Sequence, residues 1–222
     1  DVYKRQIEVS SETDVADVYV VNTCTVTNLS DRKSRQYIRR AKRENPESIV
    51  CVVGCYSQVS PDEVKAIEGV DIIMGTTDRN RIVELVENFE KDKSQISIVK
   101  SLKGFTEFQH IEIDKESEMT RSYMKVQDGC NRFCTYCIIP YARGPIRSRT
   151  IEDSVEEAKR LSEAGYKEIV LTGIHIGSYG KDLGDERLVD LIEEIAKVDG
   201  IERIRLSSIE PITITRAVSY TH

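Results

Sequence analysis

Three cysteines with the spacing CxxxCxxC are the residues of this sequence best suited to chemistry. Cys130, Cys134 and Cys137 lie in a short polar run just after a strand-like segment. Three thiolates can hold three irons of a 4Fe–4S cube, which leaves the fourth iron open to react. Electron-carrying cubes use four cysteines, and structural zinc sites close all four positions, usually with CxxC pairs. The spacing therefore predicts a reactive cluster rather than an electron carrier, a zinc site or a chance group of buried thiols.

Composition limits the class of protein. The chain has 222 residues, of which 39% are hydrophobic and 32% charged, as in a globular protein of one large or two modest domains. No apolar run approaches the roughly 20 residues of a membrane span, and no signal peptide opens the chain. Six cysteines with ligand-like spacing indicate reduced thiols, so we expect a cytoplasmic protein without a membrane partner. The net charge of −6 argues against nucleic-acid binding over the whole surface.

The first part of the chain alternates between strand-like and helical segments. Apolar β-rich runs predict strands at 17–22, 49–53 and 70–74. One helix is expected to begin within 27–30 and to run to about 43. A second is expected to begin after Ser60, its cap residue, with Pro61 in its first turn. A third is expected from 78 to about 89. This alternation predicts a parallel sheet, and hence a Rossmann-like α/β domain over residues 1–90.

The second part repeats the pattern after a polar connector at 91–121, in which 96–99 and 108–113 are candidate edge strands. Strands are expected at 122–126, 168–172 and 203–207, and helices at 151–164, followed by Gly165, and at 188–198. This order predicts a partial β/α (TIM-type) barrel over residues 122–222. Such barrels carry their chemistry at the carboxyl ends of the strands, where the cysteine loop lies.

Several longer runs resemble one family. The run 127–144 around the three cysteines is similar to radical S-adenosylmethionine (SAM) enzymes of the methylthiotransferase branch. The segments 21–26 and 54–57 are similar to the amino-terminal domain of that branch. The segments 171–180 and 206–211 are similar to the subgroup that acts on N6-threonylcarbamoyladenosine in tRNA. The resemblance covers about 15–215, and because the sequence begins with Asp and ends without a clear cap, we expect a fragment that lacks both ends.

The resemblance implies SAM and two 4Fe–4S clusters as cofactors. Cys130, Cys134 and Cys137 would hold the cluster that binds SAM. Cys24 and Cys55 would be two of three ligands of an auxiliary cluster, and we expect the third to lie upstream of Cys24, outside this sequence.

The same resemblance suggests which residues contact SAM. Thr172 with Gly173 would hold the methionine amino group. By its position between two of the ligands, Tyr136 would either cover the cluster and pack on the adenine or simply pack within the loop. Ser207 and Glu210 are further candidate contacts at the barrel rim. No side chain is expected to act as a catalytic acid or base, because the cluster and SAM carry the reaction through a 5′-deoxyadenosyl radical.

The implied reaction adds a methylthio group to C2 of threonylcarbamoyladenosine next to the tRNA anticodon. The implied partners are tRNA and an external electron donor, and the protein is expected to be a monomer whose fragment alone is inactive. The alternatives are a methylthiotransferase for isopentenyladenosine tRNA or for a ribosomal-protein aspartate, a non-catalytic iron–sulfur or zinc module, and a simple RNA-binding protein.

Other residues of possible function have two interpretations. A basic helical face formed by Arg32, Arg35, Arg39 and Arg43 would suit tRNA phosphates or be a solvated surface. A second set, Arg143, Arg147 and Arg149, follows the cysteine loop and could contact RNA or the cofactor carboxylate. Cys51 lies mid-strand and is expected to be a buried structural thiol. His175 lies near the site but is expected to be structural.

Overall fold

The computed structural model describes residues 15–25, 28–109, 121–214, 216 and 218. These residues form two compact units. The first comprises the described residues of Asp1–Ser101 together with Tyr136–Ala142, and the second those of Leu102–Thr135 and Arg143–His222.

The first unit is built on a parallel sheet whose strands lie in the order β1-β2-β3-β4. The strands are β1 (Val18–Thr23), β2 (Ile49–Gly54), β3 (Ile72–Met74) and β4 (Ile96–Ile98). Every neighbouring pair is parallel, as the alternation of strands and helices predicts. The candidate edge strand at 96–99 is confirmed as β4, at the edge of this sheet.

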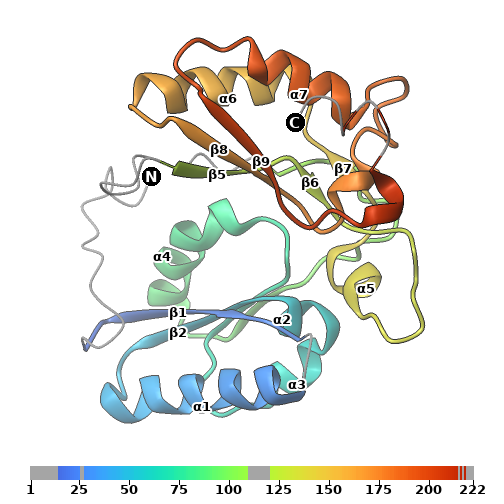
Figure 1. The fold of residues 1–222 in the computed structure, drawn as a ribbon. Helices are drawn as coiled ribbons and strands as arrows, with labels where there is room; N and C mark the ends of the chain where they lie inside the picture. Colours follow the sequence, from blue (N-terminus) through green and yellow to red (C-terminus); the bar gives the residue numbers. More distant parts are fainter. Residues whose placement is uncertain (1–14, 26–27, 110–120, 215, 217, 219–222) are drawn as a thin grey trace. The chain divides into compact units, whose positions relative to one another are not determined.

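Helices cover both faces of this sheet: α1 (Asn28–Glu44) lies below it and α4 (Ile82–Asp92) above it in Figure 1. All six residues of β2 are buried, because alternate side chains point to opposite faces and both faces are covered. Val50 packs in the cluster that contains Ile38 of α1, whereas Cys51 packs in the cluster that contains Phe89 of α4.

Short helices follow two of the strands. Helix α2 (Cys55–Val59) begins directly after β2, and α3 (Pro61–Lys65) follows it. Pro61 occupies the first turn as expected, but the side chain of Ser60 makes no capping hydrogen bond, so the predicted cap is wrong in that respect. The helix expected from Asp78 begins instead with a 3-10 turn, η2 (Arg79–Arg81), because Asp78 is in the left-handed conformation with φ 58°.

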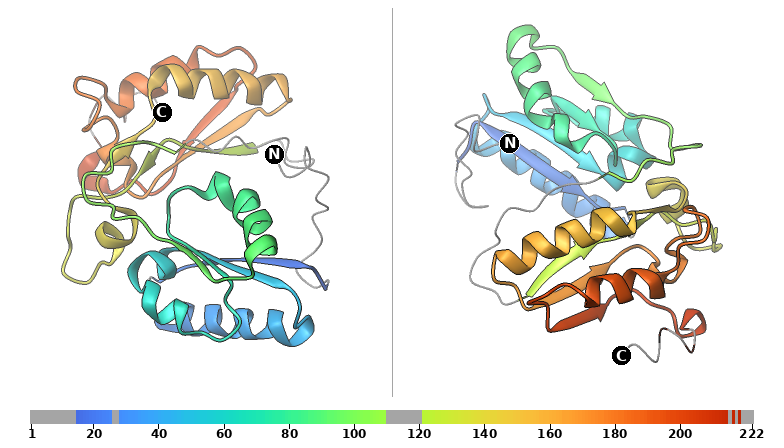
Figure 2. Two further views of the ribbon diagram at one scale, coloured as in Figure 1. Left: turned by 180° about the vertical axis from the view of Figure 1, so that it is seen from behind. Right: turned by 90° about the horizontal axis from the view of Figure 1, so that it is seen from above.

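The second unit contains a parallel sheet in the order β5-β8-β9. The strands are β5 (Arg121–Lys125), β8 (Glu168–Thr172) and β9 (Arg203–Leu206), close to their predicted positions. Helices α6 (Ile151–Glu163) and α7 (Leu188–Ala196) lie on one face of the sheet (Figures 1 and 2). Three strands with two covering helices form part of a β/α barrel, as predicted.

Thr150 and Gly165 bound α6. The Thr150 side chain accepts a hydrogen bond from the backbone N–H of Asp153, and Gly165 follows the helix with φ 95°. A side-chain cap at the start and a left-handed glycine at the end satisfy backbone groups that the helix leaves unpaired. The glycine was predicted from the sequence, whereas the threonine cap was not.

The remaining elements of the chain were not predicted. Strands β6 (Gln127–Asp128) and β7 (Arg147–Ser148) pair antiparallel, and the one-turn elements are α5 (Ile139–Arg143), η3 (Ile176–Ser178) and η4 (Pro211–Thr213). Residues 108–109 form no strand, and 110–113 of that expected strand lie outside the described residues. Among the described residues, no helix has the length and apolar character that crossing a membrane requires.

Leu191 tests the packing of the second unit. Its side chain is fully buried on α7 in the cluster that joins α6 and α7 to the sheet. Leu191→Ala should lower the free energy of unfolding by about 2–5 kcal/mol, because it leaves a cavity. Glu193→Ala on the exposed face of α7 should change it by less than about 0.5 kcal/mol. Urea unfolding measures both, and equal effects would contradict this packing.

Candidate functional site

The cysteine loop is closed at its base by backbone contacts. Gly129 adopts φ 71°, and a Cβ at this position would lie 1.8 Å from the carbonyl oxygen of Pro145. The backbone N–H of Cys130 donates a hydrogen bond of 3.0 Å to the carbonyl of Gly144. The backbone that leaves β6 therefore packs directly against the backbone that returns to β7. We call this contact, between residues 129–130 and 144–145, the neck of the loop, and only glycine fits it at position 129.

Charged side chains hold the same neck. The carboxylate of Asp128 pairs with Lys125 and lies 3.5 Å from Nη2 of Arg147 and 3.8 Å from Nη1 of Arg143, and it also accepts the backbone N–H of Gly129. Burial alone raises the pKa of Asp128, but the basic neighbours outweigh it and hold that pKa below its ordinary value. A buried, ionised Asp128 thus ties both ends of the loop together.

A buried amide connects this neck to the end of β8. The side chain of Gln127 is fully buried, and its Nε2 donates to the carbonyls of Asp128 (2.8 Å) and Gly129 (2.7 Å). Its Oε1 accepts the backbone N–H of His175 at 2.8 Å. Gln127 therefore determines where the cysteine loop starts relative to the segment after β8.

The three cysteines of the loop are free thiols. Cys134 is exposed, while Cys130 and Cys137 are half-buried. Cys130 and Cys134 belong to the second unit, and Cys137 lies in the short segment that groups with the first. Within the described ranges, no three His, Cys, Asp or Glu side chains are gathered as a metal site. The donor set, three free thiols on an accessible loop, nevertheless fits the chemistry of an iron–sulfur cluster.

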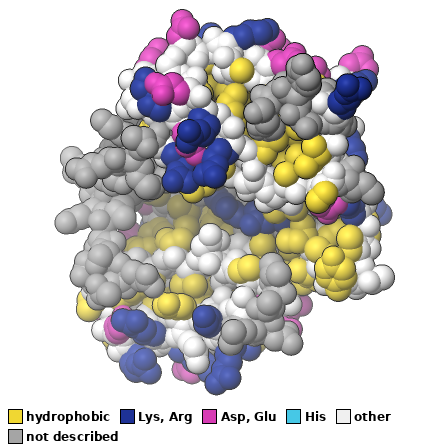
Figure 3. All heavy atoms as spheres, in the orientation of Figure 1, with side chains coloured by type: hydrophobic (Ala, Val, Ile, Leu, Met, Phe, Trp, Pro, Cys, Tyr) yellow, Lys and Arg dark blue, Asp and Glu magenta, His cyan; other side chains and the backbone are white. Residues whose placement is uncertain are grey.

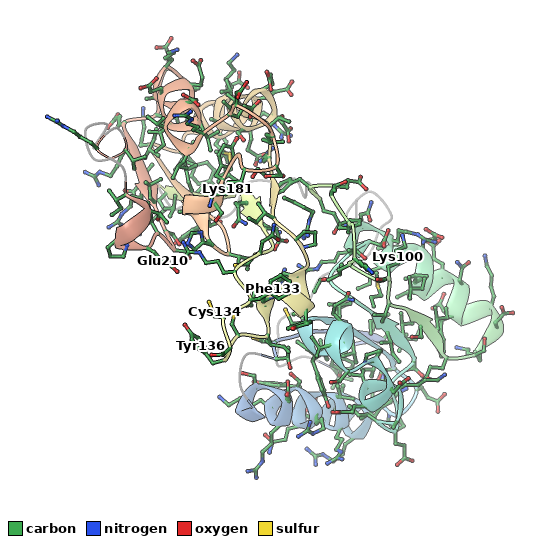
Figure 4. The ribbon with its side chains drawn as sticks, turned by 90° about the vertical axis from the view of Figure 1, so that its right-hand side faces the viewer. Lys100, Phe133, Cys134, Tyr136, Lys181 and Glu210 are labelled. Atoms are coloured by element: carbon green, nitrogen blue, oxygen red, sulfur yellow. The ribbon has the colours of Figure 1, made fainter. Side chains whose placement is uncertain are left out.

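Aromatic residues of this loop face outward. Tyr136 is 91% exposed, and it projects from the loop like Cys134 (Figure 4). Phe133 is also largely exposed and has φ 47°, a left-handed conformation that is uncommon for an aromatic residue. Neither ring is buried in the protein, so both are available to contact a bound group.

The predicted site residues of β8 and β9 lie at one edge of the second sheet. The register pairs Lys125 of β5 with Thr172 of β8, and the N–H of Ser207 donates to the carbonyl of Leu171. The Thr172 hydroxyl donates to the carbonyl of Met124 at 3.4 Å. The carboxyl ends of the three strands are therefore brought together, as expected for a barrel.

Gly173 has a structural role that the sequence did not reveal. A Cβ at Gly173 would lie 2.8 Å from Oε1 of Gln127 and 2.9 Å from its Cβ. A side chain there would displace the amide that anchors the loop. The absence of a side chain is thus required by packing, besides any role in binding a cofactor.

Glu210 connects the end of β9 to the cysteine loop. Its carboxylate pairs with Arg132, which lies between Cys130 and Cys134, and is 3.4 Å from Nε2 of His175. Burial by itself would raise the pKa of Glu210, yet nearby His175 and Arg132 lower that pKa below its ordinary value. The structure therefore places Glu210 next to the cysteine loop, with Arg132 as its partner, while its contact with SAM stays a prediction.

His175 is nearly fully buried, at 5% exposure. Its Nδ1 shares a hydrogen bond of 2.8 Å with the hydroxyl of Ser178, whereas its Nε2 has no hydrogen-bond partner among the described residues. The interpretation of His175 as structural accounts for its backbone and Nδ1. It does not account for the ring nitrogen that faces Glu210.

The two predicted auxiliary ligands, Cys24 and Cys55, follow adjacent strands of the first unit. Thr23 and Gly54 are register partners at the ends of β1 and β2, so Cys24 and Cys55 leave the sheet at the same edge. Gly54 has φ 105°, and a Cβ there would lie 2.4 Å from the carbonyl of Thr23. Cys24 is exposed, but Cys55 is 4% exposed at the start of α2.

Cys51 is a buried thiol, as predicted. Its side chain is fully buried in the cluster beneath α4. Burial, with a smaller contribution from Asp71, raises the pKa of the Cys51 thiol to about 12. A neutral thiol of this kind is inert and does not suit a metal ligand.

The arginines after the loop do not lie where the sequence suggested. Arg147 and Arg149 are each 4% exposed. Arg147 donates to the carbonyls of Arg143 and Pro145, and Arg149 pairs with Asp153 and Glu157. The suggested contact with RNA is wrong for Arg147 and Arg149, because their guanidinium groups are used inside the second unit. Contact with the cofactor carboxylate stays a prediction, as do both alternatives for Arg143. No sequence signal distinguished them from surface arginines.

Comparison with protein families identifies two segments. Residues 2–75 match the uncharacterized protein family UPF0004, and residues 124–218 match the radical SAM superfamily. The second match contains the cysteine loop and the ends of β8 and β9. A match to the radical SAM superfamily implies SAM and a 4Fe–4S cluster as cofactors.

Curated relatives agree with this division. The chain is 48% identical over 204 residues to the threonylcarbamoyladenosine tRNA methylthiotransferase MtaB of Bacillus subtilis (strain 168), covering 91% of this chain and 45% of the relative. For the protein of the same name from Aquifex aeolicus (strain VF5) the identity is 44%, covering 90% and 49%. It is 36% identical to the tRNA-2-methylthio-N(6)-dimethylallyladenosine synthase of Staphylococcus haemolyticus (strain JCSC1435), covering 90% and 40%. The chain thus spans about half the length of these relatives.

Gln127→Glu tests the anchoring of the loop. The substitution keeps the size of the side chain but replaces two buried donors with a carboxylate that faces the Asp128 and Gly129 carbonyls. We expect the free energy of unfolding to fall by about 2 kcal/mol or more, and less iron to bind after anaerobic reconstitution. Gln36→Glu on the exposed face of α1 is the control. Unchanged stability and iron content would show that Gln127 does not anchor the loop.

Thiol reactivity tests the burial of the cysteines. In iron-free protein at pH 8, iodoacetamide should modify Cys24 and Cys134 quickly, because both are exposed. Cys51 should react roughly a thousandfold more slowly, since a pKa of about 12 leaves little thiolate. Mass spectrometry of digested protein measures each site, and labelling in urea should abolish the difference. Rapid native labelling of Cys51 would contradict the structure.

The sequence motifs, the strand ends that carry them and the two family matches agree. The CxxxCxxC loop lies in the radical SAM segment, and Cys24 and Cys55 lie in the UPF0004 segment. Residues 124–218 therefore match the radical SAM superfamily and residues 2–75 match UPF0004, which agrees with the resemblance to the radical SAM methylthiotransferases.

Proposed function

We propose that the protein containing this chain adds a methylthio group to C2 of N6-threonylcarbamoyladenosine next to the tRNA anticodon. The observation that carries the proposal is the three-cysteine loop anchored at the strand ends of a radical SAM segment. The substrate rests on the relatives, since the proteins of 48% and 44% identity are both named threonylcarbamoyladenosine tRNA methylthiotransferases.

In this proposal Cys130, Cys134 and Cys137 hold a 4Fe–4S cluster that leaves one iron for SAM. When bound, the cluster and SAM supply a radical that activates a C–H bond of the substrate. The protein residues orient and shield these groups. The Asp128 pairs and the Gln127 amide hold the loop that presents the thiols.

We propose that SAM lies along the strand ends of the second unit. The backbone around Thr172 and Gly173 would hold the methionine amino group, and Ser207 and Glu210 would provide further polar contacts. In support, the backbone N–H of Ser207 is hydrogen-bonded to the carbonyl of Leu171 in β8. Glu210 forms an ion pair with Arg132 of the cysteine loop. Tyr136 is exposed enough to pack on the adenine.

A second 4Fe–4S cluster is proposed in the first unit, with Cys24 and Cys55 as two of its ligands. Their position after register-paired residues at one sheet edge supports this assignment. Ligands at the carboxyl ends of adjacent parallel strands are typical of α/β folds. Because Cys55 is buried at the start of α2, its thiol would need local opening of this helix to reach a cluster.

The remaining proposals concern partners and location. We propose tRNA as the substrate, an external electron donor, and a monomeric state. The six cysteines are free thiols, which supports a reducing compartment such as the cytoplasm. The alternative substrate is dimethylallyladenosine in tRNA, because synthases of that name are 35–37% identical to this chain.

Loss of the gene, and of single cysteines, tests the function. In tRNA from a deletion strain, mass spectrometry should find threonylcarbamoyladenosine without its methylthio group. The full-length gene should restore the group, whereas Cys134→Ala should not, because one iron loses its ligand. Cys51→Ala is the matched control and should restore it. An unchanged level of the modified base in the deletion strain would exclude this function, and loss of methylthio-dimethylallyladenosine instead would favour the alternative.

A further inference from the structure

Helix α1 is far more basic than the rest of the chain. It contains seven basic residues and two acidic ones, whereas the whole chain has a net charge of −6. Lys and Arg side chains gather over this helix at the lower edge of Figure 3. A concentration of charge of one sign on one element of an acidic protein calls for a physical reason.

Some of these charges are used within the first unit. Lys42 pairs with Asp71 at 2.9 Å, and Arg40 pairs with Glu44 at 2.6 Å. Arg35 donates to the hydroxyl of Tyr56 at 2.9 Å. These contacts lie within the first unit, so Lys42, Arg40 and Arg35 do not by themselves call for an external partner.

Three other arginines on this helix have no such partner among the residues that the structure describes. Arg32, Arg39 and Arg43 are exposed. The structure gives none of the three an ion pair with any residue it describes. At steps of seven and four residues along a helix they lie on one face, so these three arginines form what we call the α1 basic face.

The spacing of this face is unfavourable in the free protein. Arg39 and Arg43 are four residues apart, where like charges repel across one turn. The helix dipole favours cations only in the last turn, which accounts for Arg43 but not for Arg32 or Arg39. An anionic partner that bridges successive turns would relieve this repulsion.

The end of the α1 basic face opens into a groove. Arg39, Lys42 and Arg43 line one side of an open hollow of about 700 Å³, and residues 66–69 line the other. Gly69 has φ 87°, and a Cβ there would lie 2.5 Å from Cγ of Lys42, so its lack of a side chain lets the Lys42 stem cross the groove. Glu68 is the one acidic residue among those that line it.

We propose that the α1 basic face and this groove bind the phosphate backbone of RNA, and specifically of the tRNA substrate. The inference rests on the proposed function for the identity of the RNA. From Arg32 to Arg43 the helix rises about 16 Å, a length over which one strand of a duplex presents several phosphates. Planar guanidinium groups suit phosphate oxygens, and arginine is the basic residue at all three positions.

Removal of the face should weaken RNA binding without unfolding the protein. In the full-length protein, Arg32→Ala combined with Arg39→Ala and Arg43→Ala should raise the Kd for tRNA at least about tenfold near physiological salt. The slope of log Kd against log salt should fall by about one per arginine that contacts a phosphate. Fluorescence anisotropy with labelled tRNA measures both quantities. Alanine favours helix, so circular dichroism should show α1 intact.

Two controls separate the contribution of the α1 basic face to tRNA binding from the effect of total charge. A variant with Lys91→Ala, Lys159→Ala and Lys197→Ala changes the net charge equally at exposed positions on α4, on α6 and directly after α7, and should bind tRNA like the wild type. Glu68→Gln removes the acid from the groove and should tighten binding by about two- to threefold. An unchanged affinity for this variant would exclude the groove.

The outcomes also separate this inference from the proposed function. If the wild type binds tRNA and the triple arginine variant binds equally well, the α1 basic face is not the RNA site, although the proposed function stands. If the wild type does not bind tRNA at all, the proposed function fails first. Unchanged tRNA binding together with a loss of affinity for polyglutamate would assign the face to an acidic protein and overturn the inference.

Discussion

The cysteine loop depends on one buried side chain, Gln127. Its amide donates to the two carbonyls that precede Cys130 and accepts the backbone N–H of His175 after β8. An amide can do this because it has both donors and an acceptor, and full burial excludes competing water. The same arrangement constrains three neighbouring residues. Gly173 has no room for a side chain because Gln127 lies against it, and Gly129 and Asp128 close the neck of the loop next to Gln127.

Each unit uses parallel strands to bring candidate ligands to one edge. In the first unit the register of β1 with β2 puts Cys24 and Cys55 after paired residues. In the second unit the register of β5 with β8 sets Thr172 beside Lys125, from which the chain leads to the cysteine loop. Parallel pairing places all the carboxyl ends together, so residues distant in sequence become neighbours without special contacts.

The sequence did not reveal which arginines are buried and which are exposed. Arg147 and Arg149 look like surface arginines in the sequence, yet both are buried in pairs inside the second unit. Arg39 and Arg43 belong to an equally basic run and are exposed. Burying an arginine is favourable only when an acid and carbonyl acceptors surround it, and those partners come from other segments of the chain. The sequence of the run therefore cannot tell the two cases apart.

The sequence alone determined the parallel strands, the main helices and the three-cysteine motif, because periodic apolar residues and short-range spacing decide these features. It also placed Thr172, Gly173, Ser207 and Glu210 at strand ends. Only the tertiary structure showed that Arg132 pairs with Glu210, that Gln127 anchors the loop and that Cys55 is buried at the start of a helix. These features depend on contacts between residues far apart in the chain, and no local pattern encodes which of them meet.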